Sequence, residues 1–405
     1  MPRGETQHVA SMTANDDLRD TPERADLRRR VRGCLIGGAV GDAIGLPVEF
    51  KSLEQIRKIF GPDGVTELAL DMNLGAAPIS DDTQMTLFTA EGMLRGINRG
   101  NSRGVGGPSS CMTQAYLRWL VTQGETWSKE SAFQRELVLG WAAEKGPLNS
   151  PEPSDLHDFD GRHPGWLVRV KQLHARRAPG TTCLASLRAG GIVGSRVWAN
   201  DRKGNGGVMR IAPVGLFPKA DHESVFDLGC EAAGITHGHP TGRLSSGAFA
   251  LMILTIVRGG TVLQAANVAL EHLLRQSEHQ ETSAAMQRAF ELHLNGGPSS
   301  PELIERLGAG WIAEEALAIS VFCALRGEES GDFADALRLA VNHGGDSDST
   351  GSMTGQLLGA RFGLEAVPAH WVAIVELRDV ITQVADDVVT EWREDAEWWG
   401  RYPGY

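Results

Sequence analysis

GCLIGGAVGDAIG, residues 33–45, carries a glycine at every fourth position. Residues four apart share one face of an α-helix, so these glycines form a smooth stripe that lets another backbone approach closely. A second stripe of the same spacing lies in GGDSDSTGSMTGQLLGARFG, residues 344–363. The eight stripe residues are Gly33, Gly37, Gly41, Gly45, Gly351, Gly355, Gly359 and Gly363. Each interior glycine costs a helix up to about 1 kcal/mol relative to alanine, so the stripes indicate that close helix packing offsets this loss.

The remainder of the chain has helical rather than strand periodicity. After residue 27, apolar segments of helical length alternate with breaks rich in Gly, Pro and Ser, and sustained period-two alternation is scarce. We therefore predict an all-α protein. The expected helices are 28–45, 83–97, 111–123, 130–144, 225–235, 242–258, 261–275, 282–294, 301–307, 312–326, 332–341, 350–362 and 371–390.

One domain with loop insertions is the expected organisation. Residues 1–27 are polar and charged throughout, which predicts a disordered tail, and residues 28–405 are predicted to form the domain. The segments 98–110 and 146–166 are turn-rich loops, and the second is longer than compact folds usually tolerate without a functional reason. Helices resume after each loop without a shift in composition, which favours one domain over two.

Charge and cysteine content exclude several classes of function. Lys and Arg total 39 against 51 Asp and Glu, a formal net charge of −12 that repels nucleic acid. Five widely separated Cys indicate neither a disulfide framework nor a thiolate zinc site. The longest apolar run, residues 247–257, is too short to cross a bilayer, and the first residues lack a signal peptide's apolar region. We expect a cytoplasmic protein with no membrane partner.

Acidic residues cluster at two expected helix starts. Ser80, Asp81 and Asp82 precede the helix that begins at Thr83, and the stretch 346–350 (DSDST) precedes the second glycine helix. Ser and Asp are favoured N-caps, so two independent caps are one interpretation. Adjacent carboxylates exceed what capping needs and repel unless a cation neutralises them, so a shared metal site is the other. Such oxygen ligands suit Mg²⁺, Mn²⁺ or Ca²⁺, and four carboxylates suggest two divalent ions.

Together, five ordered motifs resemble the ADP-ribosylglycohydrolase family. They are GCLIGGAVGDAIGLPVEF (33–50), ISDDTQMTLFTAEGML (79–94), GNGGVMRIAPVGL (204–216), THGHPTGR (236–243) and NHGGDSDSTGSMTGQLLGARFG (342–363). The resemblance implies a compact, single-domain orthogonal helical bundle with two Mg²⁺ or Mn²⁺ ions in a central cleft. It further implies hydrolysis of the bond between ADP-ribose and an acceptor.

The resemblance also implies roles for the acidic residues. The metal ligands carried over from the family are Ser80, Asp81, Asp82, Asp346, Asp348 and Ser349. Positions 80 and 349 hold Ser where many members have Thr, which keeps the hydroxyl oxygen and loses a methyl group. Glu49 matches an acidic residue that gates the cleft, with a solvated loop carboxylate as its alternative. Asp81, Asp82 or Glu49 is expected to handle the proton, and the sequence does not distinguish them.

Substrate-binding residues are implied by the same match. They are Gly104, Gly106, Gly107, Asn205, Gly206, Gly207, Met209, Arg210, His237, Gly345 and Ser347. The glycines at 104–107 would offer backbone N–H groups to a pyrophosphate, or form a plain flexible loop. Arg210 has the alternative of a buried cation paired with a carboxylate, and His237 that of a satisfied core histidine.

Arginine is the expected acceptor, because GDSDSTG resembles the arginine-directed branch of the family. The expected partners are a protein ADP-ribosylated on arginine or a small ADP-ribosyl conjugate, with ADP-ribose as the product. Serine-linked and nucleobase-linked ADP-ribose are alternative substrates. A protein that binds ADP-ribose or occludes a toxin is the alternative from a different class, and its partner would be the toxin.

Overall fold

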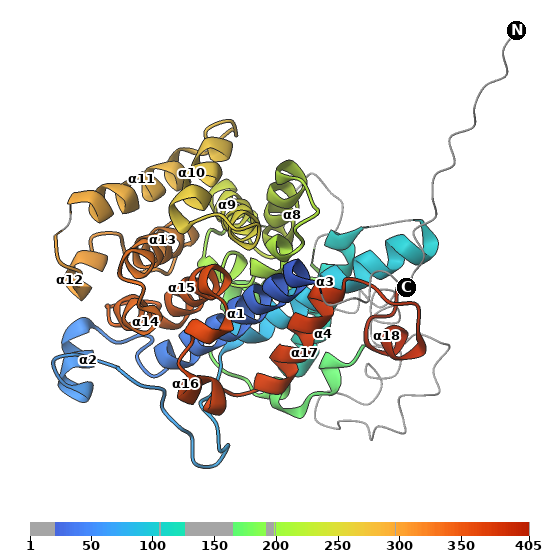
Figure 1. The fold of residues 1–405 in the computed structure, drawn as a ribbon, viewed down its shortest axis with the longest axis horizontal. Coiled ribbons are helices and arrows are strands. Elements are labelled where there is room, and N and C mark those ends of the chain that lie inside the picture. Colours follow the sequence, from blue (N-terminus) through green and yellow to red (C-terminus); the bar gives the residue numbers. More distant parts are fainter. Residues whose placement is uncertain are drawn as a thin grey trace, which may run out of the picture.

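The fold of the protein is a layered assembly of helices, seen in a computed structural model that describes residues 21–104, 107–125, 165–191, 198, 200–295 and 297–404 (Figure 1). The α-helices are α1 (Pro22–Gly45), α2 (Leu53–Phe60), α3 (Asp81–Arg103), α4 (Pro108–Thr122), α7 (Thr181–Arg188), α8 (His222–Gly234), α9 (Pro240–Val257), α10 (Val262–Leu273), α11 (Gln280–Asn295), α12 (Pro301–Ile304), α13 (Ala313–Ser330), α14 (Phe333–Val341), α15 (Ser347–Phe362), α16 (Ala369–Ile374), α17 (Arg378–Thr390) and α18 (Ala396–Arg401). Short 3-10 turns are η3 (Leu167–Arg169), η4 (Lys171–His174), η5 (Asn205–Gly207), η6 (Ala212–Leu216) and η7 (Leu364–Ala366). Within these ranges only isolated β-bridges and no strands occur, which confirms the all-α prediction.

Helices α1 and α15 pack against each other through their glycine stripes. Gly33 faces Gly359, Gly37 faces Gly355 and Gly41 faces Gly351, so the two helices run antiparallel. A Cβ atom at Gly37 would lie 2.6 Å from the carbonyl oxygen of Gly355, closer than real Cβ contacts. The predicted close approach is therefore confirmed, and it brings the C-terminal end of α1 to the N-terminal end of α15.

Helix α9 is the apolar centre of the bundle. It packs against α8, α10, α13 and α15, and Figure 1 shows it between α8 and α10. By length and composition alone α9 could cross a membrane, but 83% of its apolar window is buried inside the protein. Such burial is typical of the core helix of a globular fold.

Several predicted boundaries are wrong. Helix α1 begins at Pro22, because Thr21 caps it by accepting a hydrogen bond from the N–H of Arg24 (3.2 Å), so the boundary placed at residue 28 is too late. Helix α3 continues to Arg103 and takes up part of the loop predicted at 98–110. The helix predicted at 371–390 is two helices, since Leu377 has a left-handed φ of 61° between them.

Three expectations fall outside the described residues. They are the disorder of residues 1–20, the helix at 130–144, and the loop at 146–166 apart from its last two residues.

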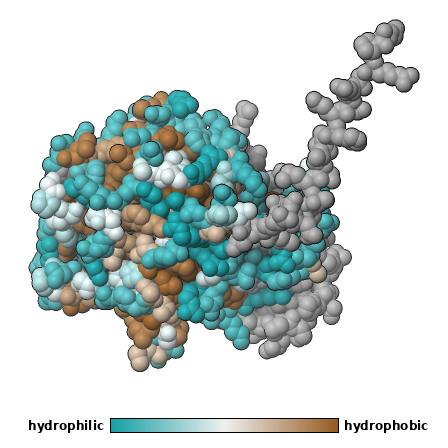
Figure 2. Space-filling view, in the orientation of Figure 1, coloured by the Kyte–Doolittle hydropathy of each residue, from teal (hydrophilic) through white to brown (hydrophobic). Residues whose placement is uncertain are grey.

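A short apolar protrusion, residues 70–76, follows α2. Its side chains Leu70, Met72 and Leu74 are exposed. Figure 2 shows a brown projection at the lower edge of the molecule, where Figure 1 draws the loop between α2 and α3. Asp71 fixes the turn, because its Oδ1 accepts hydrogen bonds from the N–H groups of Asn73 (2.7 Å) and Leu74 (3.2 Å). The protrusion thus keeps its shape through local turn chemistry, with its apolar side chains facing solvent.

The glycine contact predicts a sharp contrast between two substitutions. We expect Gly355→Ala to destabilise the protein by about 1–3 kcal/mol or more, because its Cβ would collide with the backbone of Gly37. Gly100→Ala, at an α3 position where an added Cβ meets nothing within 4 Å, should be neutral or stabilising by up to about 1 kcal/mol. Urea unfolding followed by circular dichroism measures both, and equal stability of the two variants would contradict the close helix contact.

Candidate functional site

Three segments from distant parts of the chain meet where α1 ends and α15 begins. Asp346 is the N-cap of α15, and its Oδ1 accepts a hydrogen bond from the N–H of Ser349 (3.4 Å). Ser80 is the N-cap of α3, and its Oγ accepts from the N–H of Asp82 (3.2 Å). The turn after α1 adds Glu49. Both acidic helix starts therefore cap their helices and face a common space.

That space is a cavity of about 280 Å³. Ten of the predicted site residues line it, namely Glu49, Asp81, Asp82, Asn205, Gly206, Met209, His237, Asp346, Asp348 and Ser349. Residues that the sequence did not single out complete the lining, namely Phe50, Ala178, Pro179, Gly180, Thr181, Thr182, Cys183, Gly204 and Trp311. The cavity thus gathers acidic, small and aromatic side chains.

Five carboxylates crowd this cavity. One oxygen from each of Glu49, Asp346 and Asp348 lies within 4.8 Å of the others. Burial raises the pKa of Glu49 to about 8, helped by the charges of Asp346 and Asp81. Burial likewise raises the pKa of Asp81 to about 8, with the charges of Asp42 and Asp346 adding to the effect. The ionised cluster is therefore strongly disfavoured unless positive charge enters the cavity.

The donor set of the cavity fits divalent cations. No Lys or Arg is among the described residues that line it, and burial holds the pKa of His237 at about 3, so this imidazole is neutral. In the described part of the chain, the buried Asp82 Oδ1 has no hydrogen-bond partner. All the clustered donors are hard oxygens, which suit Mg²⁺ or Mn²⁺. The shared cavity favours a common cation site over two independent caps.

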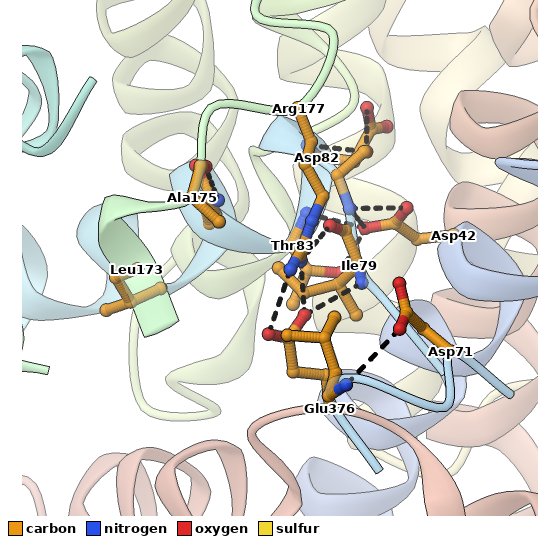
Figure 3. Close-up of polar contacts among 12 residues, drawn as sticks. Asp42, Asp71, Ile79, Asp82, Thr83, Leu173, Ala175, Arg177 and Glu376 are labelled. Carbon is orange, nitrogen blue, oxygen red and sulfur yellow. Dashed lines mark hydrogen bonds and ion pairs between the residues drawn. The ribbon is translucent and has the colours of Figure 1, made fainter. Parts of the chain in front are cut away.

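Asp42 fixes the start of α3 to α1, and the sequence analysis missed it. Its two carboxylate oxygens each accept a hydrogen bond from the N–H of Ser80 (3.0 Å). Its Oδ2 also accepts from the N–H (3.1 Å) and hydroxyl (2.5 Å) of Thr83, as Figure 3 shows. Burial raises the pKa of Asp42 to about 6, and these hydrogen bonds oppose the rise. A detectable signal existed, because Asp42 is the one charged residue in the stretch 33–45.

A second anchor lies on the other side of the α3 start. Arg177 donates to the carbonyl oxygen of Ile79 (2.9 Å) and pairs with Glu376, which accepts from the N–H of Ile79 (3.2 Å; Figure 3). The chain that follows Arg177 turns into the cavity, where the N–H of Gly180 donates to Asp81 Oδ2 (3.1 Å). Gly180 therefore holds the side chain of Asp81, and Arg177 and Glu376 hold the backbone at Ile79, just before α3.

Asn205 connects the predicted substrate strip to the carboxylates. Its Nδ2 donates to Asp346 Oδ2 (2.7 Å) and to the carbonyl oxygen of Gly310 (2.8 Å). Gly206, Met209 and His237 line the same side of the cavity, and His237 Nδ1 lies 2.8 Å from Thr236 Oγ1. All four residues therefore border the cavity, and their contact with a substrate stays a prediction.

Other predicted substrate residues lie behind the cavity wall. Gly345 packs against the carbonyl group of Ala309, Gly207 packs against Ala233, and Ser347 is fully buried at the contact with Gly45. Close packing explains these residues better than substrate contact. Ser80 is also fully buried, and its Oγ donates to Asp82 Oδ2 (3.3 Å), which keeps it next to the predicted ligands.

Arg210 is a buried cation, as its alternative interpretation stated, but a carboxylate is not its partner. Its guanidinium lies 4.1 Å from the ring centroid of Tyr116 and donates to Thr236 Oγ1 (2.8 Å) and the carbonyl oxygen of Ala232 (3.2 Å). Among the ion pairs of the described chain, none involves Arg210. Arg210 does not itself line the cavity, but its Nη1 donates to the Sγ of Cys183 (3.5 Å), which does.

Gly104 and Gly107 do not border the cavity. Helix α3 separates Gly104 from Asp81 by about 33 Å at its rise of 1.5 Å per residue, and Gly104 serves as its left-handed C-cap. Gly107 precedes α4 next to Gly96, about 22 Å from Asp81 along α3. Gly106 lies outside the described residues. The two described glycines are not placed for the expected pyrophosphate contact at this cavity, because both follow the end of α3 that is opposite its acidic start.

The sequence and fold of the chain are similar to those of known ADP-ribosylglycohydrolases. The chain is 22% identical to the ADP-ribosyl-[dinitrogen reductase] glycohydrolase of Rhodospirillum rubrum, with 86% of this chain and 91% of that protein covered. It is 22% identical to the ADP-ribosylarginine hydrolase Tri1 of Pseudomonas putida (strain GB-1), with 91% and 79% covered. A solved structure of an ADP-ribosylglycohydrolase-related protein complex has the same fold, with a TM-score of 0.52 and 22% identity over 91% of this chain and 98% of that one.

The sequence pattern of the ADP-ribosylglycohydrolase family matches residues 23–397, which include α1, α3, α15 and every carboxylate of the cavity. On that match the chain belongs to the ADP-ribosylglycohydrolase family.

Proposed function

We propose that the protein releases ADP-ribose from arginine side chains, with two Mg²⁺ or Mn²⁺ ions held in the carboxylate cavity. Family membership supports the removal of ADP-ribose from a modified acceptor. The observation that carries the proposal is the set of five carboxylates lining one cavity, with no Lys or Arg among its described lining residues. Similarity to an ADP-ribosylarginine hydrolase supports arginine as the acceptor.

In the proposed site, α3 and α15 each provide half of the cation ligands. Ser80, Asp81 and Asp82 come from the start of α3, and Asp346, Asp348 and Ser349 come from the start of α15. When bound, the cations would neutralise charge at the reacting centre and acidify a water molecule. Asn205 and Gly180 hold Asp346 and Asp81 in place by the hydrogen bonds described above. The ligands are thus preorganised by backbone and side-chain donors.

Glu49 is the proposed proton carrier. It is less buried than Asp81, Asp82, Asp346 and Asp348, so it has the better access to solvent. Its position on the turn after α1 places its carboxylate beside the α15 pair without the hydrogen bonds that fix the other acids to their helices. A carboxylate near the reacting bond can accept a proton from water and return it to the leaving group.

Activity assays with three linkages test the proposal. With Mg²⁺ or Mn²⁺ present, we expect release of ADP-ribose from arginine-linked substrate and little release from serine-linked or nucleobase-linked substrate. Asp348→Asn removes one predicted cation ligand and should lower kcat at least about hundredfold. Chromatographic detection of free ADP-ribose measures the outcome. Unchanged turnover in Asp348→Asn, or in excess chelator, would rule out the cation mechanism.

Thermal stability without cations should depend on pH. A carboxyl whose pKa rises on folding, here to about 8 for Glu49 and Asp81, binds protons more tightly in the folded protein. Stability of the metal-free protein should therefore increase as the pH falls from about 8 toward the unfolded value of about 4. We expect a higher Tm at about pH 6 than at about pH 8 in chelator, measured by scanning calorimetry.

Added Mg²⁺ or Mn²⁺ should raise Tm most at the higher pH, because the carboxylates are then ionised and repel one another. The Asp348→Asn variant serves as the control and should respond less to the ions. A Tm at about pH 8 that is the same with and without ions would contradict the proposed role of the cluster.

Asp42 should tune cation affinity through the position of α3. We expect Asp42→Asn to weaken Mn²⁺ binding about 10- to 100-fold while the protein stays folded, because an amide oxygen replaces part of the charge-assisted hydrogen bonding to Ser80 and Thr83. Isothermal titration calorimetry measures the affinity, and circular dichroism verifies the fold. Asp63→Asn, an exposed change outside the cavity, is the matched control. Equal affinity in the two variants would show that Asp42 does not position the ligands.

A further inference from the structure

Two aromatic side chains stack at the exposed rim of the carboxylate cavity. The ring centroids of Phe50 and Trp311 lie 4.9 Å apart with an interplanar angle of 21°. Phe50 is 70% exposed and Trp311 is 37% exposed, and both line the cavity. One face of Phe50 covers Trp311, so its other face is open to solvent. We call this pair the aromatic rim.

The aromatic rim is tied to the reacting groups through its backbone. Phe50 directly follows Glu49 and adopts a left-handed φ of 64°, which is uncommon for a bulky residue and marks a constrained position. The carbonyl oxygen of Trp311 accepts a hydrogen bond from the N–H of Asn205 (3.1 Å), the residue that holds Asp346. Phe50 is therefore the sequence neighbour of Glu49, and Trp311 is hydrogen-bonded to the residue that holds Asp346.

Neither ring can ligate a cation, and the open face of Phe50 at the edge of the cavity is available for contact with a ligand. We propose that the aromatic rim binds the planar cationic side chain of the acceptor, the guanidinium group of an ADP-ribosylated arginine. This inference rests on the proposed function and assigns the acceptor subsite within it. A guanidinium stacks on aromatic faces and binds carboxylates through its N–H groups. At the rim, an aromatic face lies beside the carboxylates of the cavity.

The charge around the cavity favours a cation at this position. Five carboxylates line the cavity, and neither Lys nor Arg is among its described lining residues. Two divalent cations would offset four of these five charges, so the filled site would keep a net negative charge that attracts a guanidinium. A neutral serine linkage would gain nothing from this field. The rim thus contributes to selection of the acceptor as well as to its binding.

The exposure of the rim also suits an acceptor that belongs to a protein. A cavity of about 280 Å³ lies at the lower end of what holds one small ligand, so a protein acceptor has to remain outside it. The open face of Phe50 lies where the chain of such an acceptor would approach. The opposite assignment, in which the rim stacks the adenine of ADP-ribose, predicts a different binding pattern and is separated by the test below.

Steady-state kinetics and product binding test the aromatic rim together. The variants are Trp311→Ala and Phe50→Ala, with Trp311→Phe as the conservative replacement and Phe60→Ala, an exposed aromatic at the end of α2, as the matched control. The substrates are arginine-linked and serine-linked ADP-ribosyl peptides. Affinity for free ADP-ribose, which lacks an acceptor, is measured by isothermal titration calorimetry, and each variant is checked for an unchanged Tm.

We expect each alanine variant to raise KM for the arginine-linked peptide about three- to tenfold, while kcat changes little and ADP-ribose affinity changes less than about twofold. Trp311→Phe should retain most of the wild-type KM, and Phe60→Ala all of it. An equal loss of ADP-ribose affinity would overturn the inference in favour of adenine stacking, and an unchanged KM would overturn it outright. Failure of the wild-type protein to act on arginine-linked substrate would instead refute the proposed function, and the inference with it.

Discussion

Backbone contact between α1 and α15 determines where every carboxylate of the cavity lies. The glycines remove the side chains between the two helices, so the helix axes approach until carbonyl groups and Cα atoms touch. Because the helices are antiparallel, this contact places Glu49, just after α1, beside Asp346 and Asp348 at the start of α15. Asp42 follows Gly41, one of the contact glycines of α1, and its carboxylate fixes the start of α3 by accepting hydrogen bonds from Ser80 and Thr83. One helix pair thus assembles both halves of the proposed cation site.

The same assembly carries an electrostatic cost that the apolar core has to offset. Asp82 and Asp348 are almost fully buried, and burial raises the pKa of both well above the usual range for aspartate. A cavity of this kind would be poorly stable as an ionised, cation-free cluster. Helix α9 and its neighbours surround the site with closely packed apolar side chains, and this rigid frame keeps the carboxylates from moving apart. Stability is thereby given up locally for a cluster of oxygen donors that fits a divalent cation.

Much of this arrangement could be predicted from the sequence, because the motifs that produce it are short and continuous in the chain. Stripes of glycine four residues apart and acidic helix starts are visible in short stretches, and the structure brings them together as predicted. The aromatic rim could not be predicted, since Phe50 and Trp311 are distant in sequence and only the tertiary fold stacks them. Gly104 and Gly107 lie away from the cavity because they follow α3, whose acidic start faces the cavity and whose other end does not. Arg210 shows a further limit, because its partners are a ring, a hydroxyl and a carbonyl group rather than the expected carboxylate.

We propose that the glycine-paired helices create one site for two divalent cations. The number of Mn²⁺ ions bound per chain can be counted by calorimetric titration together with electron paramagnetic resonance of the bound ions. We expect two ions per chain whose spectrum shows that they are magnetically coupled neighbours. A stoichiometry of zero, or one isolated ion per chain, would contradict it.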